Sequence, residues 1–310
     1  MTLLENPKIR AATVSIIAAV GLAVTKLFIA LASGSMAILA SAIDSLLDIL
    51  MSGVNFVAIR HAEQPADECH PFGHGKFETL ATLFQSLVIT ASGSLILFES
   101  VRRLLAGPVL QKLDQGIGIL AISAAVSFFV ARYLKKVGKQ TDSSALEADS
   151  LHFSMDIYTN TALLVGLLLV RWFDIPWLDP ALSILVGLYI LYEASQLIRH
   201  SMGDVLDREL PAELQQQIKT LIEEQQHGFG SYHGLRTRRA GSRKIMDFHL
   251  EVCKHMSVQD AHDIADRLEK KIERAILGAD VTIHIEPCAQ QNCPGVDQCD
   301  QVKSRFKTEG

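Results

Sequence analysis

Hydrophobic residues are grouped in long segments over the first two thirds of the chain. Six segments can be distinguished, at residues 12–33, 36–59, 78–101, 114–134, 147–170 and 178–199. Each is close to the ~20 residues that a helix needs to cross ~30 Å of hydrocarbon. Beyond residue 208 the segments become short and charged. The pattern predicts a six-helix transmembrane domain at residues 1–207, a water-soluble domain at residues 208–290, and a polar, mobile tail at residues 291–310.

The second segment carries polar side chains at helical spacing. They are Ser41, Asp44, Ser45, Asp48, Ser52 and Asn55. In a helix this spacing places them on one face, whereas the other faces are apolar. A carboxylate near the bilayer centre costs roughly 2.5–3.5 kcal/mol on insertion scales. Asp44 and Asp48, one turn apart, therefore indicate a functional site inside the membrane.

The fifth segment repeats this arrangement. Its polar face holds Asp149, His152, Asp156, Thr159 and Asn160. If the two helices face each other, the imidazole of His152 and the carboxylates of Asp44, Asp48 and Asp156 meet at one point. One nitrogen and three oxygens form a tetrahedral set suited to a divalent ion such as Zn2+. The alternative is hydrogen bonding between helices, which we accept for Ser41, Ser52 and Thr159.

Lys26 is the one cation well inside the first segment. Lysine side chains near a helix end commonly extend toward the membrane surface. We therefore expect Lys26 to reach the outer interface rather than to pair with the acidic residues of the second segment.

A polar loop joins the second and third segments. Asp67, His70 and His74 have a spacing typical of metal ligands, and Pro71 and Gly73 would bend the backbone between them. The same spacing is equally consistent with a solvated loop. Neighbouring Cys69 could add a thiolate ligand, although we favour a free cysteine that does not bind the metal.

The last third of the chain predicts an α+β domain. Residues 211–226 and 257–277 have helical patterns, whereas residues 232–239, 244–252 and 281–286 have strand patterns. The order helix, strand, strand, helix, strand is compatible with an open-faced sandwich of helices on an antiparallel sheet.

Strand alternation places several histidines on the polar face of this sheet. His249 alternates with apolar residues of its strand, and His284 and Glu286 do the same in the last strand. His233 and His262 lie where they could approach the same face. Four histidines with one carboxylate predict metal binding, and solvent-exposed histidines without a metal remain the alternative.

Charge and composition narrow the possible functions. The chain of 310 residues is 49% hydrophobic, only 20% charged, and has a net charge of −5. It has no basic run and no glycine-rich phosphate loop, which argues against nucleic-acid binding. The first residues do not resemble a cleavable signal peptide. Five cysteines, an odd number outside the predicted spans, fit a reducing cytoplasm; they are Cys69, Cys253, Cys288, Cys293 and Cys299.

Positive charges predict the orientation in the membrane. Lys and Arg are more frequent beside the ends of the segments that share a side with the N-terminus than beside the opposite ends. Since such residues accumulate on the cytoplasmic side, both termini are expected in the cytoplasm. We expect a multi-pass protein of the inner (cytoplasmic) cell membrane.

Several stretches together resemble the cation diffusion facilitator family, and in particular its bacterial zinc and ferrous-iron efflux type. They span nearly the whole chain: DSLLD at 44–48, QPADECHPFGHGKFE at 64–78, ADSLHFSMD at 148–156, LDRELP at 206–211, HGLRTRRAG at 233–241, DFHLEV at 247–252, QDAH at 259–262 and HIEPC at 284–288.

The resemblance implies three groups of metal ligands. The transport site would comprise Asp44, Asp48, His152 and Asp156, and the loop site Asp67, His70 and His74. A binuclear cytoplasmic site would comprise His233, His249, His262, His284 and Glu286. Glu286 departs from the family pattern, in which this position is Asp, and its side chain is one methylene longer. The tail with Cys293 and Cys299 is not part of that pattern, and its spacing does not favour a zinc knuckle.

The resemblance also implies how the chain assembles and acts. It implies a homodimer joined through the C-terminal domains, with Lys76 and Asp207 as a charge pair near the membrane surface. The expected function is efflux of a divalent cation, Zn2+ first, in exchange for protons. Fe2+, Cd2+ or Mn2+ as the substrate is one alternative, and a transport-inactive metal sensor is another. A membrane metallohydrolase is disfavoured because no H-E-x-x-H motif is present. The expectation is a secondary transporter and not an enzyme.

Overall fold

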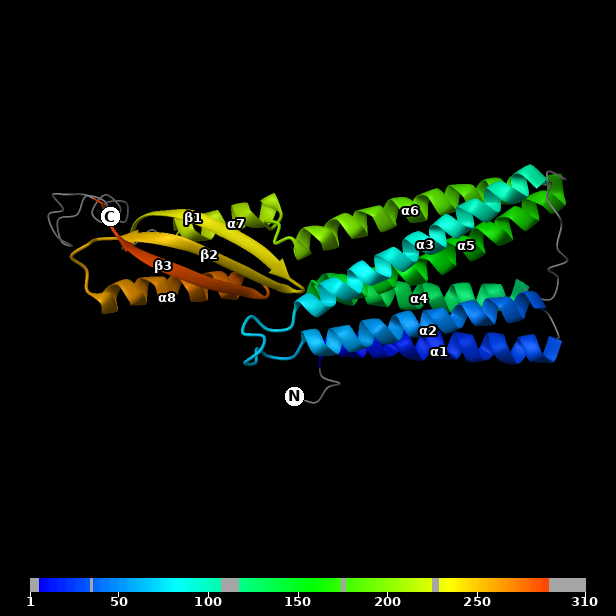
Figure 1. Cartoon of the computed structure of the whole chain (residues 1–310), viewed down its shortest axis with the longest axis horizontal. Helices are drawn as coiled ribbons and strands as arrows, with labels where there is room; N and C mark the ends of the chain where they lie inside the picture. Colours follow the sequence, from blue (N-terminus) through cyan, green and yellow to red (C-terminus); the bar gives the residue numbers. More distant parts are fainter. Residues whose placement is uncertain (1–5, 34–35, 107–116, 174–176, 225–228, 290–310) are drawn as a thin grey trace, which may run out of the picture. The chain divides into compact units, whose positions relative to one another are not determined.

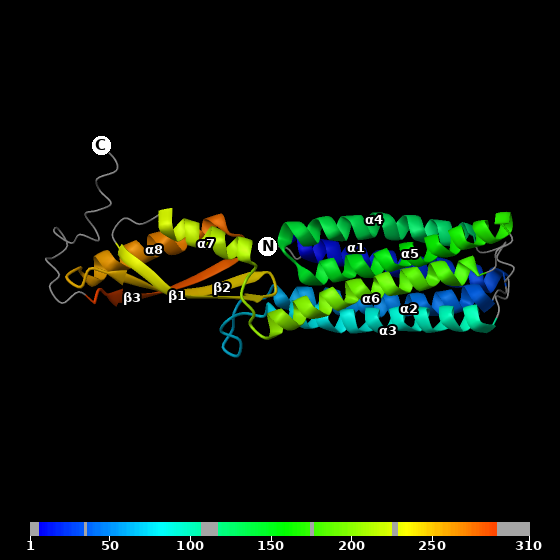
Figure 2. The same ribbon diagram turned by 90° about the horizontal axis from the view of Figure 1, so that it is seen from above.

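The computed structural model describes residues 6–33, 36–106, 117–173, 177–224 and 229–289, which divide between two units. The first, Met1–Gly203, is helical, and the second, Asp204–Gly310, combines helices with a sheet (Figures 1 and 2). The proposed tail at residues 291–310 lies outside the described residues, as do Cys293 and Cys299.

The first unit contains six long helices. They are α1 (Pro7–Ser33), α2 (Met36–Ala62), α3 (Lys76–Ala106), α4 (Ile117–Thr141), α5 (Ser144–Phe173) and α6 (Leu178–Val205). Each of the six hydrophobic segments overlaps one of these helices. The helices run side by side along their length (Figure 1).

The outer surface of this bundle is apolar. Phe28, Leu95, Phe98 and Phe129 are between 67 and 72% exposed. Within the described residues, three helical stretches are long and apolar enough to cross a membrane by composition: Pro7–Leu31, Lys76–Ala106 and Pro180–Val205. The crossing of the membrane by all six helices remains a prediction.

Small side chains allow the helices of the bundle to approach closely. On α1, Ala11, Ala12 and Ala19 are at most 1% exposed and pack against a cluster that includes Leu134 of α4 and Phe153 of α5. A Cβ placed on Gly93 of α3 would lie 2.9 Å from a side-chain carbon of Ile190 on α6. Small residues at helix contacts are typical of membrane bundles.

The second unit has the predicted order of elements. It consists of α7 (Ala212–Glu224), β1 (Phe229–Ala240), β2 (Arg243–Val252), α8 (Val258–Ala275) and β3 (Ala279–Pro287). β1 and β2 form a hairpin whose two-residue turn, Gly241 and Ser242, uses a positive φ of 63° at Gly241. The side chain of Ser257 caps α8 by accepting a hydrogen bond from the backbone N–H of Asp260 at 3.1 Å.

The sheet is mixed, so the prediction of an antiparallel sheet is wrong. β1 pairs with β2 in antiparallel fashion, but β2 pairs with β3 in parallel fashion. The cause is α8, which lies between β2 and β3 in the sequence and carries the chain back to the end of the sheet where β2 begins. A helical crossover of this kind joins parallel strands.

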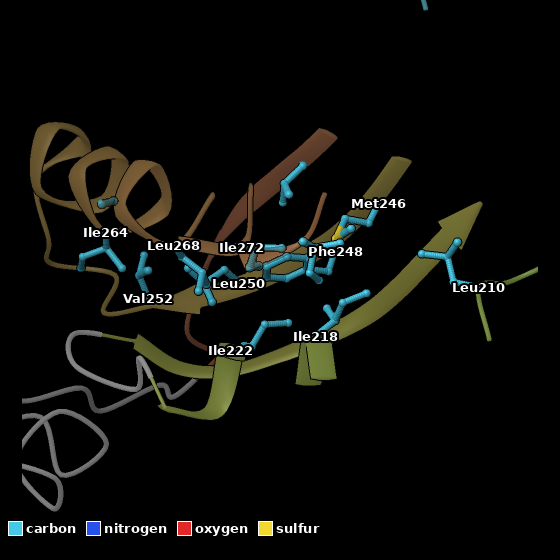
Figure 3. Close-up of a cluster of buried hydrophobic side chains, with 13 residues drawn as sticks. Leu210, Ile218, Ile222, Met246, Phe248, Leu250, Val252, Ile264, Leu268 and Ile272 are labelled. Atoms are coloured by element: carbon cyan, nitrogen blue, oxygen red, sulfur yellow. The ribbon is translucent and has the colours of Figure 1, made fainter. Parts of the chain in front are cut away.

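Both helices of this unit cover the same face of the sheet. Phe248 and Leu250 of β2 are fully buried between Ile218 of α7 and Leu268 and Ile272 of α8 (Figure 3). Burial alternates along β2, with every second residue facing the helices. His249 therefore lies on the sheet face opposite to α7 and α8.

Truncation of the core should unfold the second unit alone. Replacing Phe248 by Ala removes a fully buried aromatic ring, which typically costs about 3–5 kcal/mol. We expect faster amide hydrogen exchange in β2, β3 and α8 of the full-length protein, with exchange in α1 to α6 unchanged. The matched control is Phe129→Ala, since this ring is 70% exposed. Unchanged protection of β2 in Phe248→Ala would contradict the assignment of this core.

Candidate metal centres

The acidic face of α2 meets the histidine of α5 in the helical bundle. Nε2 of His152 lies 3.0 Å from Oδ1 of Asp48, and the side chains are 13% and 19% exposed. The predicted contact between these two helices is therefore present. A buried carboxylate needs such a partner, since an unpaired charge in an apolar interior is costly.

Two further residues of the predicted quartet belong to the same helices. Asp156 is one turn beyond His152 on α5, half-buried, and close enough to interact with the imidazole electrostatically. Asp44 is one turn from Asp48 on α2. Its side chain lies outside the described ones, so the complete quartet stays a prediction. These residue types could hold a divalent cation with one nitrogen and up to three carboxylates.

Lys26 does not follow the expectation that it reaches the outer interface. Its Nζ donates a hydrogen bond to Oγ of Ser45 at 2.8 Å, and Ser45 is fully buried. Ser45 precedes Asp48 by one turn on α2. The ammonium group therefore points into the contact between α1 and α2, where a hydroxyl satisfies it.

The loop after α2 brings its three candidate ligands together. One ligand atom each from Asp67, His70 and His74 lies within 4.8 Å of the others. Oδ1 of Asp67 is 3.2 Å from Nδ1 of His70, and Oδ2 is 3.2 Å from Nε2 of His74. Gly73 has a φ of 79° and donates its N–H to the carbonyl of His70 at 2.9 Å, which closes the turn.

The environment of this loop favours a cation. The backbone N–H of His70 donates to Oδ1 of Asp67 at 2.6 Å and is the main reason that the pKa of Asp67 is lowered. Nδ1 of His74 lies 3.2 Å from the carbonyl of Pro65. A proton on Nδ1 would satisfy that contact and leave the Nε2 lone pair facing the Asp67 carboxylate, so that a cation between them binds both.

The second unit forms a row of histidines across its three strands. His233 pairs with His249 in the register of β1 and β2, and His249 pairs with His284 in that of β2 and β3. The ring centroids of each neighbouring pair are 5.0 Å apart. Gly234, with a φ of 65°, bulges β1 beside His249, and a Cβ there would lie 3.4 Å from the imidazole.

Glu286 joins this row of histidines. Its Oε1 is 2.6 Å from Nδ1 of His249, and its Oε2 is 3.4 Å from Nε2 of His233. The hydrogen bond from His249 is the largest reason that the pKa of Glu286 is lowered. His233, His249 and Glu286 have ligand atoms within 4.8 Å of one another. The longer side chain of Glu286 still reaches both imidazoles.

Two predicted ligands are less closely placed. Nε2 of His284 is 3.9 Å from Oε1 of Glu286, at the border of this group. His262 is exposed on α8, which covers the opposite face of the sheet, and it does not belong to the clustered ligands among the described residues. The sequence left this difference open because a helical pattern does not reveal the sheet face that the helix covers.

Other predicted residues have different surroundings. Oδ1 of Asp207 is 3.4 Å from Nη1 of Arg238 within the second unit. Its pairing with Lys76 is untested, since these two residues belong to different units. Cys69 is exposed, whereas Cys253 and Cys288 are buried. The N–H of Cys288 donates to the carbonyl of Val252 at 2.8 Å, which joins the residue after β3 to the end of β2.

The sequence reasoning did not assign Glu78, Gln85 and Asp149, which are all at most 1% exposed inside the helical unit. Gln85 Nε2 donates to Oδ1 of Asp149 at 3.4 Å. Glu78, Thr82 and Gln85 are spaced four and three residues apart on α3. The helical spacing that marked α2 and α5 would have found this third polar face.

Removal of His249 should abolish metal binding at the sheet. We expect His249→Ala to weaken Zn2+ binding there at least a hundredfold, because this imidazole lies between His233 and Glu286. Equilibrium dialysis of the full-length chain, with Asp48→Asn and Asp67→Asn to remove the other centres, would measure it. Binding should also fall from pH 7 to pH 5.5, since imidazole must be neutral to bind a metal. His255→Ala, an exposed histidine outside the group, is the control, and equal losses in both variants would refute this centre.

Two models of known protein families match the chain, one over most of each unit. The family described as "Cation efflux transmembrane domain" matches residues 12–206, and "Cation efflux protein, cytoplasmic domain" matches residues 210–288. The chain is 35% identical over 268 residues to the cation-efflux pump FieF of Yersinia pestis (strain Pestoides F), covering 86% of this chain and 89% of the relative. The corresponding pump of Yersinia pseudotuberculosis serotype I (strain IP32953) gives the same values.

Two solved structures are similar to about a quarter of the chain. The zinc form of the zinc transporter CzrB is 37% identical, with a TM-score of 0.25, and covers 26% of this chain and 92% of that chain. The metal-bound C-terminal domain of the CzcD transporter from Thermotoga maritima is 29% identical, with a TM-score of 0.24, and covers 26% and 92%. With both family matches and the similarity to FieF over most of its length, the chain belongs to the cation diffusion facilitator family and is a cation efflux transporter of the membrane, not an enzyme.

Proposed function

We propose that this transporter exports Zn2+ from the cytoplasm in exchange for protons. The site of exchange would be Asp44, Asp48, His152 and Asp156, between α2 and α5. The observation that carries the proposal is the 3.0 Å contact between Nε2 of His152 and Oδ1 of Asp48, which joins the two helices inside the bundle.

The chemistry of this site suits an exchange of metal for protons. Neutral imidazole and carboxylates bind a dication, whereas protonated forms of the same groups do not. The imidazole of His152 is the group of this site that gains a positive charge when it takes up a proton, which fits it to carry a proton. Protons arriving from the outer side would displace the metal there, and their release to the cytoplasm would restore the ligands. Access from the two sides would alternate by movement of the helices.

The two centres outside the bundle would bind cytoplasmic metal without transporting it. Asp67, His70 and His74 lie in the loop next to the end of α2. His233, His249, His284 and Glu286, with His262, would bind metal in the second unit and stabilise a homodimer joined there. Lys76 and Asp207 would pair near the surface of the inner membrane, with both termini in the cytoplasm.

Loss of a quartet residue should abolish transport. Purified protein in vesicles should accumulate Zn2+, and Asp48→Asn and His152→Ala should each reduce the initial rate at least a hundredfold, since each removes a ligand. Glu99→Gln is the control because Glu99 is an exposed carboxylate paired with Arg103 on α3. Rates in Asp48→Asn close to that of the unmodified protein would refute the shared site.

Proton coupling requires its own measurement. An imposed pH gradient, acidic on the outer side, should increase the rate of Zn2+ efflux several-fold. Zn2+ flux should in turn change the pH of a lightly buffered vesicle interior. If the rate of Zn2+ efflux did not depend on the pH gradient, the protein would still be a cation transporter, but the proposed exchange with protons would be wrong.

The transported ion has alternatives. Fe2+, Cd2+ and Mn2+ can use the same oxygen and nitrogen ligands, and the affinity order does not fix the physiological substrate. Competition among these ions for Zn2+ uptake in the same vesicles would rank them. A transport-inactive sensor is the remaining alternative, and the pairing of Asp48 with His152 inside the bundle argues against it.

A further inference from the structure

A column of buried polar side chains extends through the bundle from the contact of Asp48 with His152 toward the end where α5 begins. It includes residues of α1, α2, α3 and α5 that are at most 1% exposed. They are Ser15, Ser52, Asn55, Glu78, Thr82, Gln85 and Asp149. Polar residues inside a membrane bundle commonly mark an ion pathway.

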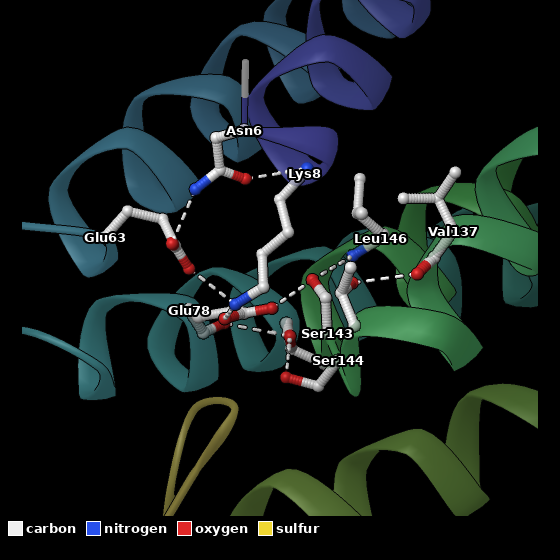
Figure 4. A network of polar contacts seen from close by, with 10 residues as sticks. Asn6, Lys8, Glu63, Glu78, Val137, Ser143, Ser144 and Leu146 are labelled. Atoms are coloured by element: carbon white, nitrogen blue, oxygen red, sulfur yellow. Dashed lines mark hydrogen bonds and ion pairs between the residues drawn. The ribbon is translucent and has the colours of Figure 1, made fainter. Parts of the chain in front are cut away.

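Contacts connect successive levels of this column. At the end of the column where α5 begins, Glu78 accepts a hydrogen bond from Ser143, and its Oε2 is 3.7 Å from Nζ of Lys8 (Figure 4). Lys8 is also 2.5 Å from Oε1 of Glu63. One turn further along α3, Thr82 donates to Oγ of Ser144 at 3.1 Å.

The next residues of the column approach the proposed transport site. Asn55 Nδ2 donates to Oε1 of Gln85 at 2.7 Å, and Gln85 Nε2 lies 3.4 Å from Oδ1 of Asp149. Ser15 donates to Ser52 at 2.9 Å on the adjoining contact of α1 with α2. Asp149 precedes His152 by one turn on α5, and Asn55 follows Asp48 by two turns on α2. The column therefore ends at the Asp48–His152 contact.

Asp149 is the least satisfied member of the column. Its side chain is fully buried, and Oδ2 has no hydrogen-bond partner among the described residues. Its Oδ1 lies 3.4 Å from the amide nitrogen of Gln85, and Ser15 and Asn55 also interact with the carboxyl group. A polar network that only joins helices normally satisfies its buried groups, because an unsatisfied oxygen costs about 1–3 kcal/mol. The free oxygen therefore requires another explanation.

We infer that this column is the path of the divalent cation between the transport site and the Glu78 end of the bundle, and that Asp149 binds the cation on the way. The inference rests on the proposed transport function. Carboxylate, amide and hydroxyl oxygens are suitable ligands for a divalent cation. One carboxylate among neutral donors binds weakly, which suits a position that the ion must also leave.

The Glu78 end of the column is also suited to a passing cation. Glu78 is a second carboxylate, fully buried and offset here by the ammonium group of Lys8. An entering dication would displace this ammonium group toward Glu63, which already contacts it. The exchange keeps the charge of the buried carboxylate compensated throughout.

Accessibility of position 149 tests the path directly. The five native cysteines would be replaced by serine or alanine, and Asp149→Cys introduced in the full-length chain in vesicles. We expect a small cationic methanethiosulfonate reagent to modify the introduced thiol, and Zn2+ to slow this at least tenfold. Ile190→Cys is the control, since Ile190 is 1% exposed in an apolar cluster of α3, α5 and α6. No modification, or modification that Zn2+ leaves unchanged, would overturn the inference.

Transport kinetics give a second measure that does not depend on the introduced thiol. Asp149→Asn keeps the size and hydrogen bonding of the side chain but removes its charge. We expect the maximal rate of Zn2+ transport to fall about tenfold, and Asp149→Glu to restore much of it. Glu193→Gln on α6, a half-buried carboxylate away from the column, should transport normally. A normal rate in Asp149→Asn would show that its carboxylate does not bind the ion.

The two proposals fail in different ways. If the unmodified protein transports no Zn2+ but the thiol at position 149 is modified and protected, the export function is wrong, whereas binding of the cation in the column stands. If transport is normal but the thiol is unprotected, the path is wrong and the export function stands.

Discussion

The cost of burying carboxylates in an apolar bundle determines how its interior is organised. An isolated charge there is unfavourable by several kcal/mol, so each acidic side chain needs a partner. Asp48 contacts His152, and Glu78 contacts Lys8 and Ser143. The carboxylates lie on α2 and α3, and their partners come from α1, α5 and the segment before α5, so the same contacts that compensate the charges also fix how the helices pack. Asp149 keeps one oxygen without a hydrogen-bond partner among the described residues, and this is where we infer that the cation binds.

The candidate ligands of the second unit face water, so burial of charge does not constrain them as it does in the bundle. Its apolar core fills one face of the sheet between Phe248 and Leu268, and the opposite face presents His249 with Glu286. The register of the three strands places the histidines in a row. Water competes for each ligand there, and metal binding must therefore depend on the number of ligands that converge.

The periodicity of the sequence predicted which side chains share one face of a single helix or strand. The helical spacing of Asp48 in α2 and of His152 in α5 anticipated a contact that the structure contains, and strand alternation placed His249 and Glu286 on one face. Periodicity did not predict features that depend on how two elements pack against each other. The direction of β3 depends on α8, the direction of Lys26 depends on the hydroxyl of Ser45, and the position of His262 depends on which sheet face α8 covers. The column at Asp149 draws on four helices, and no single segment reveals it.

The three candidate centres share one arrangement, in which a carboxylate contacts an imidazole: Asp67 with His70 and His74, Asp48 with His152, and Glu286 with His249. Without a metal, a proton on the imidazole can compensate the carboxylate, and a dication must displace that proton to bind. At the two exposed centres the proton returns to the water that supplied the metal, so the exchange is only a pH dependence. Inside the bundle the ligands are enclosed. We propose that metal and proton enter there from opposite sides, so that the same exchange becomes coupled transport.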